Sequence, residues 1–266
     1  MEHIPVRGIT DIAADVLRNS GELIVFIHGV GADRTSWKYQ LQFFHDKGYS
    51  VAALDMRGSG DSASRDVHHN MLPISLTEFA KDVDAAIKAL GYEKAHWVGN
   101  SMGGVIILEA IRLGLPSVNT IALCNTFAYY PDHAATLPRA KAALEVKSLP
   151  DFAAERIPLV LRPDIDKPTL DEAIHAMARK DPEAYLASWQ ATWSPDFRSE
   201  LGQIKNKTLV VSGSLDKITP VALSEKLKQH IPGAKQVTIE GAGHISNLDQ
   251  PEEFNKLLFE FLQETK

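Results

Sequence analysis

The stretch WVGNSMGG, residues 97–104, decides the fold of this 266-residue chain. Gly99 and Gly103 flank Ser101 at the spacing G-x-S-x-G, between an apolar run and a helical pattern that continues to Leu113. A strand that turns this sharply into a helix holds its central residue at a strained positive φ, and only small neighbours let the two elements pass so closely. The turn would expose the Ser101 hydroxyl at a helix N-terminus, where backbone N–H groups stabilise negative charge. Because the motif alone also fits an ordinary glycine-rich turn, its context has to decide.

A second turn lies upstream of this motif. The apolar run LIVFI, residues 23–27, predicts a strand buried on both faces, and it ends in HGVG, residues 28–31. We expect the backbone N–H groups of Val30, in this turn, and of Met102 to form an oxyanion hole beside Ser101. His28 is interpreted as a structural residue that orients the loop. Taken alone, the segment would be an ordinary turn at the end of a strand.

Two later strands end in residues that can serve Ser101. LVVSGSLD, residues 209–216, is an apolar strand that runs into Asp216, and VTIEGAGH, residues 237–244, is a strand that leads to His244. Each residue alone also fits a plain loop position. The chain order Ser101, Asp216, His244 is the order that a G-x-S-x-G turn requires of a nucleophile, an orienting acid and a base. The order therefore predicts these three catalytic roles.

These segments, together with LDMRGSGDS at residues 54–62, resemble the α/β-hydrolase family over nearly the whole chain. The resemblance implies an α/β fold, with a mostly parallel sheet, helices on both faces and an inserted helical cap. It also implies the catalytic residues Ser101, His244 and Asp216. Some members carry their acid after an earlier strand, where this chain has CNT, residues 124–126, without a carboxylate. Asp216 therefore keeps the role.

The remaining pattern alternates strands with helices. We predict strands near residues 11–17, 22–27, 50–54, 94–98, 118–123, 207–212 and 235–239, and helices near 36–47, 77–90, 102–113, 220–230 and 251–263. Such alternation favours a mostly parallel sheet that is covered on both faces. Right-handed crossovers would then bring the three catalytic candidates to one edge of the sheet.

Residues 128–201 interrupt this alternation, because they contain no clear buried strand and form a helical pattern broken by prolines. The resemblance implies a cap over the active site at this point, and we divide the chain into a core, residues 1–127 and 202–266, and a cap, residues 128–201. Tyr130, Trp189 and Trp193 are predicted to bind substrate, although the helical spacing of Trp189 and Trp193 equally fits the core of the cap. Three arginines could bind a substrate carboxylate through both of its oxygens, namely Arg139, Arg156 and Arg162. For each of them alone, the alternative is a solvated position on the surface.

Composition excludes several classes of function. A net charge of −6 gives no electrostatic footprint for nucleic acid or an anionic membrane, and no run of about 18 apolar residues predicts a membrane span. The N-terminus lacks a signal-peptide pattern, and Cys124 is the only cysteine, so a cytoplasmic location is expected. We predict no cofactor and no metal, since the pair His68-His69 has no supporting ligands nearby. The sequence is compatible with a homo-oligomer.

The sequence predicts a serine hydrolase that cleaves a carboxylic ester or a lactone, including an enol-lactone, of small or medium size through an acyl-enzyme on Ser101. The segment HISNLDQP, residues 244–251, is similar to 3-oxoadipate enol-lactonases and allied carboxylesterases. Carbon–carbon bond hydrolases of aromatic-ring cleavage generally carry a tryptophan after the base, where this chain has Ile245. That activity on a diketone, cofactor-free perhydrolysis and non-catalytic ligand binding remain the alternatives.

Overall fold

Eight strands form one sheet, in the order β1-β2-β4-β3-β5-β6-β7-β8, in the computed structural model, which describes residues 1–264. Only β2 runs against its neighbours, and the remaining pairs are parallel, which confirms the mostly parallel sheet. The strands are β1 Glu2–Val6, β2 Thr10–Leu17, β3 Leu23–Ile27, β4 Ser50–Leu54, β5 Ala95–Asn100, β6 Val118–Cys124, β7 Thr208–Gly213 and β8 Lys235–Ile239.

The first strand was not predicted. Its sequence, EHIPV, is short and partly polar, and it contains Pro5, which cannot donate to a sheet ladder. Strand β1 lies at the edge of the sheet and pairs only with β2, which is the position where a proline is tolerated. The seven predicted strands are all present, with ends that differ by a residue or two.

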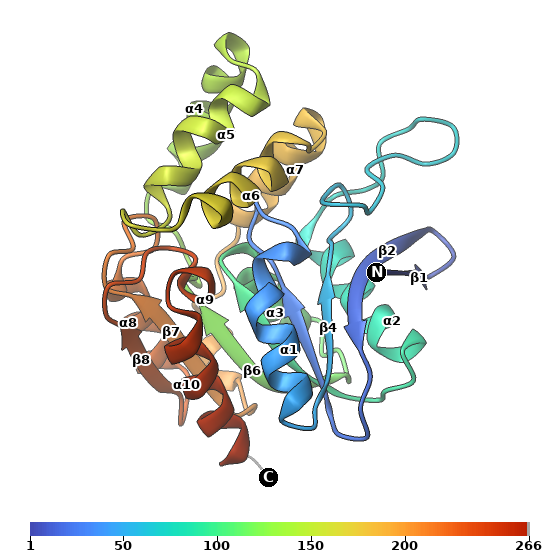
Figure 1. Cartoon of the computed structure of the whole chain (residues 1–266), viewed down its shortest axis with the longest axis vertical. Helices are drawn as coiled ribbons and strands as arrows, with labels where there is room; N and C mark the ends of the chain where they lie inside the picture. Colours follow the sequence, from blue (N-terminus) through green and yellow to red (C-terminus); the bar gives the residue numbers. More distant parts are fainter. Residues whose placement is uncertain (265–266) are drawn as a thin grey trace.

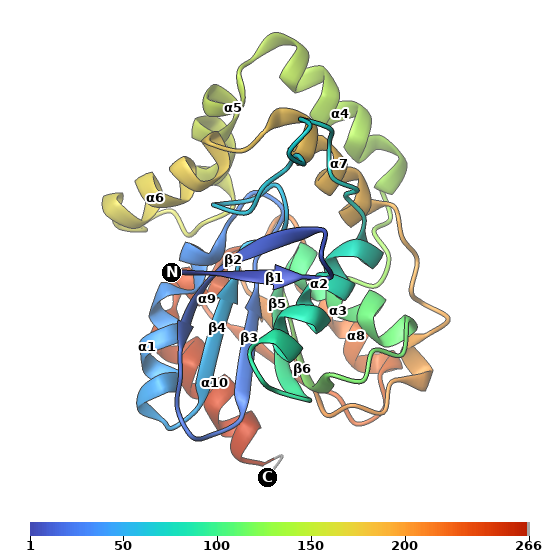
Figure 2. The same ribbon diagram turned by 90° about the vertical axis from the view of Figure 1, so that its right-hand side faces the viewer.

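Helices cover both faces of the sheet (Figures 1 and 2). One face carries α1 and α10, and the other carries α2, α3 and α8, as the two separate hydrophobic clusters show. The core helices are α1 Lys38–Asp46, α2 Leu76–Ala89, α3 Met102–Arg112, α8 Val221–His230, α9 Ser246–Asp249 and α10 Pro251–Gln263. Short 3₁₀ turns are η1 Arg34–Trp37, η2 Ile157–Leu159 and η3 Leu201–Gln203.

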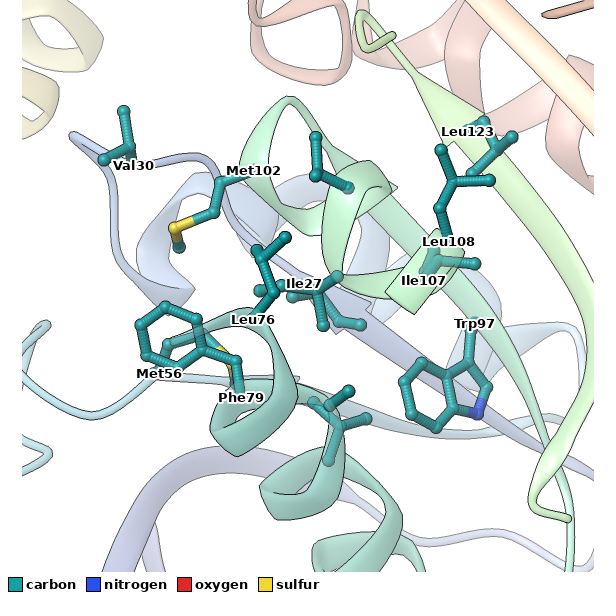
Figure 3. Packing of buried hydrophobic residues seen from close by; sticks show 14 of the residues in the cluster. Ile27, Val30, Met56, Leu76, Phe79, Trp97, Met102, Ile107, Leu108 and Leu123 are labelled. Atoms are coloured by element: carbon teal, nitrogen blue, oxygen red, sulfur yellow. The ribbon is translucent and has the colours of Figure 1, made fainter. Parts of the chain in front are cut away.

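The central strand β3 explains why the sheet is buried on both sides. Its alternate residues Leu23, Val25 and Ile27 join the cluster under α2 and α3, whereas Ile24 and Phe26 join the cluster under α1 and α10. Figure 3 shows part of the first cluster, in which Ile27 of β3 lies among side chains of α2 and α3. The apolar run that predicted this strand therefore reflects two apolar layers and not one.

Residues between β6 and β7 form four helices, α4 His133–Val146, α5 Leu149–Arg156, α6 Lys167–Ala178 and α7 Pro182–Trp193. These helices lie together above one end of the sheet (Figure 2). Pro150, Pro168 and Pro182 stand in the first turns of α5, α6 and α7, so they begin helices where sequence alone indicated breaks. Proline suits this position because the first-turn N–H has no intrahelical partner to lose.

The two ends of the segment that carries α4 to α7 lie side by side where they join the core. Tyr129 and Asp196 form an isolated bridge, and the N–H of Phe197 donates to the carbonyl of Ala128 at 2.9 Å. Within residues 1–264, no helix has the length and apolar character needed to cross a membrane.

Candidate active site

Ser101 occupies a strained turn between β5 and α3. Its φ of +53° and ψ of −112° lie in a region that residues other than glycine rarely adopt. The backbone is held there by the end of β6 and the loop after it, since the N–H of Ser101 donates to the carbonyl of Cys124 at 2.9 Å and its carbonyl accepts from the Thr126 hydroxyl at 2.8 Å. The packing of the sheet thus fixes the strained conformation that the sequence motif predicts.

The flanking glycines allow the close approach of strand and helix. A Cβ atom on Gly103 would lie 2.2 Å from the backbone oxygen of Ile27, and one on Gly99 would lie 2.3 Å from the backbone of Gly103. Both distances are far below van der Waals contact with atoms that cannot move aside. The two glycines are therefore required by the packing of α3 against the sheet.

His244 and Asp216 form a buried pair on the loops after β8 and β7. Nδ1 of His244 lies 2.9 Å from Oδ2 of Asp216. The carboxylate also accepts from the backbone N–H groups of Ile218 and Thr219, at 2.8 and 2.9 Å, and from the Thr219 hydroxyl at 2.6 Å. Burial opposes ionisation, but the His244 ring and the hydrogen bonds from the side chains of Thr219 and Asn125 together lower the pKa of Asp216 to about 2. Asp216 is therefore ionised at neutral pH and fixes Nδ1 of His244 as the protonated nitrogen.

Asn125 is a part of this site to which the sequence analysis gave no role. It occupies the slot where some relatives carry the acid, and here its amide donates to Oδ2 of Asp216 at 2.9 Å and to the Gly243 carbonyl at 3.1 Å. Its own oxygen accepts from the Ser246 hydroxyl at 2.6 Å. Asn125 thus connects the acid to the loop that carries the histidine, and its position directly after β6 was the available signal.

Ser101 and His244 line the same cavity, of about 50 Å³, to which the inserted helices α5, α6 and α7 also contribute side chains. The two turns are tied together, because the side-chain amide of Asn100 donates to the backbone carbonyl of His244 at 2.9 Å. Ser101 and His244 are both more than nine-tenths buried. The structure therefore brings together the three residues that the sequence placed on separate strands.

Val30 and Met102, the predicted oxyanion-hole residues, belong to the two turns next to Ser101. Val30 lines the cavity, and Met102 is the first residue of α3, where a backbone N–H has no intrahelical partner. The glycine-rich loop comes close to the turn, since a Cβ on Gly29 would lie 3.3 Å from Cβ of Ser101.

His28 orients this loop, as expected. Its Nδ1 lies 2.7 Å from the Gly29 carbonyl, and its Nε2 accepts from the N–H of Met56 at 3.1 Å. Burial lowers the pKa of His28 to about 3, so the ring is neutral and can act as donor and acceptor at once.

Asp249 joins the histidine loop to the inserted helices. Its carboxylate accepts from the N–H of Gly243 at 2.7 Å and from the N–H of Arg162 at 3.0 Å, and the N–H of His244 donates to the Val160 carbonyl at 2.7 Å. Burial raises the pKa of Asp249 to about 6. The backbone next to the histidine is therefore held by the segment between α5 and α6.

The predicted substrate-binding aromatics line two adjoining cavities. Trp189 and Trp193 line both the cavity that contains Ser101 and an outer cavity of about 260 Å³, and Tyr130 lines the outer one. The hydroxyl of Tyr130 donates to the Ile218 carbonyl at 3.3 Å, and its ring packs edge-on against Trp193 with centroids 4.4 Å apart. These side chains therefore pack on one another and also border the space next to Ser101.

Two other conspicuous groups are structural. Arg57 forms a fully buried pair with Asp82, and Asp55 accepts from the guanidinium of Arg34 at 2.5 Å. Among residues 1–264, no three His, Cys, Asp or Glu side chains are grouped so that they could hold a metal ion.

Comparison with known proteins adds independent evidence. The family described as alpha/beta hydrolase fold matches residues 22–251. The chain is 30% identical over 246 residues to 3-oxoadipate enol-lactonase 1 of Acinetobacter baylyi, which spans 90% of this chain and 88% of the relative. It is 29% identical to a putative carbamate hydrolase of Variovorax paradoxus, over 98% of this chain and 95% of the relative.

The crystal structure of the enol-lactonase from Burkholderia xenovorans LB400 has the same fold, with a TM-score of 0.88 and 26% identity over 98% of this chain and 100% of that one. The similarity covers the sheet, the turns that carry Ser101, Asp216 and His244, and the inserted helices. The chain is therefore an enzyme of the α/β-hydrolase family, similar along its length to enol-lactonases.

Proposed function

We propose that this enzyme is a serine hydrolase that cleaves a carboxylic ester or a lactone through an acyl-enzyme on Ser101. One observation carries the proposal. A serine held at positive φ lines the same cavity as a histidine whose Nδ1 is hydrogen-bonded to a buried, ionised aspartate. This arrangement has the parts that acyl transfer needs, namely a nucleophile, a base and a group that orients the base.

The reaction begins at Ser101. Since Nδ1 of His244 donates to Asp216, Nε2 is left as the acceptor and takes the Ser101 proton while Oγ bonds to the carbonyl carbon. Asp216 stabilises the imidazolium that forms. His244 then protonates the departing alkoxide, which in a lactone stays attached to the acyl group.

Negative charge develops on the carbonyl oxygen as Oγ adds. The backbone N–H groups of Val30 and Met102 are proposed to stabilise it, each by roughly 3–4 kcal/mol in the transition state. Water, deprotonated by His244, then attacks the acyl-enzyme and releases the acid, with its proton returning to Ser101.

The helices α4 to α7 are proposed to act as a cap that selects substrates. Their two ends lie side by side at the bridge between Tyr129 and Asp196, and they supply Trp189 and Trp193 to the cavity next to Ser101. The cavity of about 50 Å³ favours a small acyl group at the reacting carbon. Residues 128–201 thus correspond to a specificity unit on a fixed catalytic core.

Kinetics of Ser101→Ala and His244→Ala on 4-nitrophenyl acetate and on a small lactone test the proposal. Each variant should lose on the order of 10⁴-fold or more in kcat, and the double variant should lose no more than either single one, because the residues act as a unit. Ser199→Ala, which alters an exposed serine that lines none of the cavities described above, is the matched control and should behave as the wild type. Retention of most activity by Ser101→Ala would overturn the proposed mechanism.

A further inference from the structure

Arg156, at the C-terminal end of α5, lies on the wall between the two cavities. It lines both the cavity that contains Ser101 and the outer cavity beyond it. Its guanidinium carbon lies 5.1 Å from the centre of the Trp189 ring, which holds the charge by a cation–π contact. The position is therefore defined by packing and is adjacent to the reacting centre.

Arg156 differs from every other arginine of the chain in its partners. Each of the others has a carboxylate within 4.0 Å, including Arg139, which pairs with Asp132, and Arg162, which pairs with Asp164. Among residues 1–264, no carboxylate lies within that distance of Arg156. A partly buried guanidinium without a counter-charge is unusual, because desolvating a cation costs free energy that a paired anion normally offsets.

Other unpaired donors border the same cavity. The indole nitrogens of Trp189 and Trp193 and the hydroxyl of Tyr185 are buried and have no hydrogen-bond partner within the described part of the chain. An indole N–H can only donate, and burial raises the pKa of Tyr185, so its phenol keeps its proton. Each of these three groups can donate a hydrogen bond, and residues 1–264 supply no acceptor for it.

The described part of the chain contributes no aspartate or glutamate to the lining of either cavity, whereas Arg156 lines both and Arg139 lines the outer one. Electrostatics therefore favours an anion in this space and disfavours a cation. A carboxylate, which only accepts hydrogen bonds and can bind an arginine with both oxygens, matches the donors present.

From these contacts we propose that the substrate is an ester or lactone with a second, free carboxylate on its acyl part, and that Arg156 binds this carboxylate. The inference rests on the proposed function, because it assigns the substrate class of the same site. The reacting carbonyl lies in the inner cavity beside Ser101, and the anionic end points towards the wall that the two cavities share. Arg156 is a specificity-determining residue and takes no part in the covalent steps.

A matched pair of esters tests the inference. 4-Nitrophenyl hydrogen glutarate and its methyl ester have the same chain and the same leaving group, and they differ in the terminal charge. The wild type should favour the charged ester in kcat/KM, chiefly through KM. Arg156→Gln should lower the ratio of charged to neutral kcat/KM by about 10–100-fold, the value of one charge-assisted hydrogen-bonded pair.

Controls separate charge from folding. Arg198→Gln removes an arginine that pairs with Asp196 and lines neither of the two cavities, so the wild-type ratio should persist. Arg156→Lys keeps the charge without the planar fork and should recover part of the ratio. A measurement without a variant is competition, in which glutarate should raise the apparent KM of the wild type and neutral glutaramide should not.

The outcomes distinguish the two proposals. A wild type that cleaves both esters equally well, or an Arg156→Gln variant that keeps the wild-type ratio, would overturn the carboxylate site while the serine hydrolase stands. A wild type that cleaves neither ester nor a small lactone would overturn the proposed function itself.

Discussion

Replacing Asp216 by asparagine removes one charge and leaves the shape of the side chain. The carboxylate accepts five hydrogen bonds, two on Oδ1 from backbone N–H groups and three on Oδ2 from Thr219, Asn125 and His244. An asparagine has one oxygen for these donors. That oxygen should keep the two backbone N–H groups, since neither can rotate away, and the amide NH₂ would then face His244. Nδ1 must become the acceptor, and the proton moves to Nε2, which can no longer take a proton from Ser101.

The expected losses in turnover and in stability both follow from this geometry. The wrong tautomer should lower kcat by roughly 10⁴-fold, whereas KM should change little because Asp216 does not line the cavity. The pKa of about 2, against 3.8 ordinarily, means that folding favours the ionised carboxylate by roughly 2–3 kcal/mol. A chain of this size should then lose about 5–10 °C in Tm at neutral pH.

The pH dependence of the free energy of unfolding is a separate test of the ionised state of Asp216. Because the folded pKa lies below the unfolded one, the stabilisation by Asp216 is complete above about pH 4 and is lost as the pH falls towards 2. The assay is kcat and KM on 4-nitrophenyl acetate together with thermal unfolding, with Asp164→Asn, at a carboxylate that is 82% exposed, as the control for the same chemical change. Near wild-type turnover by Asp216→Asn would refute the reasoning and show that another group orients the histidine.

Three further changes test other parts of the account. Gly103→Ala should destabilise the fold by several kcal/mol, because its Cβ would lie 2.2 Å from the Ile27 carbonyl oxygen. Gly202→Ala is the control, since its Cβ would meet no atom of the described chain within 4 Å. Urea unfolding compares the two variants, and equal stabilities would contradict the packing argument. Asn125→Ala removes one donor from the histidine-paired carboxylate and should lower kcat by about 10–100-fold, so unchanged kinetics would show that this donor is dispensable. Burial lowers the pKa of Lys180 to about 8 from an ordinary value near 10.5, so the unfolded chain keeps this proton to a higher pH than the folded chain does. The free energy of unfolding of the wild type, relative to that of Lys180→Met, should therefore rise by roughly 2–3 kcal/mol between pH 7.5 and 10. A stability difference that stays flat over this range would mean that Lys180 is not titrating in the folded protein.

The strands and the three turns of the site could be predicted because each has a recognisable local sequence pattern. Strand β3 is an uninterrupted apolar run, and the turn at Ser101 needs small residues at fixed spacing, so both are visible without knowledge of the tertiary structure. The edge strand β1 could not, because a short, partly polar strand with a proline gives no period-two pattern and depends on β2 for its pairing.

Contacts between distant segments were also beyond the sequence. Asn125 and Asp249 each bond to groups about 80 to 120 residues away, and their chemical type alone does not select those partners. The absence of a counter-ion at Arg156 likewise appears only when all neighbouring carboxylates are placed. The helical pattern of residues 128–201 predicted that helices are present there. Which aromatic side chains border the cavity depends on how those helices pack on the core.

The acyl-enzyme is the centre of this account, and peptide mass mapping tests it most directly. The protein is mixed with 4-nitrophenyl acetate, quenched in acid within the first turnovers and digested, and the peptide that carries the added acetyl group is sequenced by fragmentation. One acetyl group is expected on Ser101, and none in Ser101→Ala treated in the same way. An acetyl group on another residue of a wild type that is turning over, or an adduct that persists unchanged in Ser101→Ala, would contradict it.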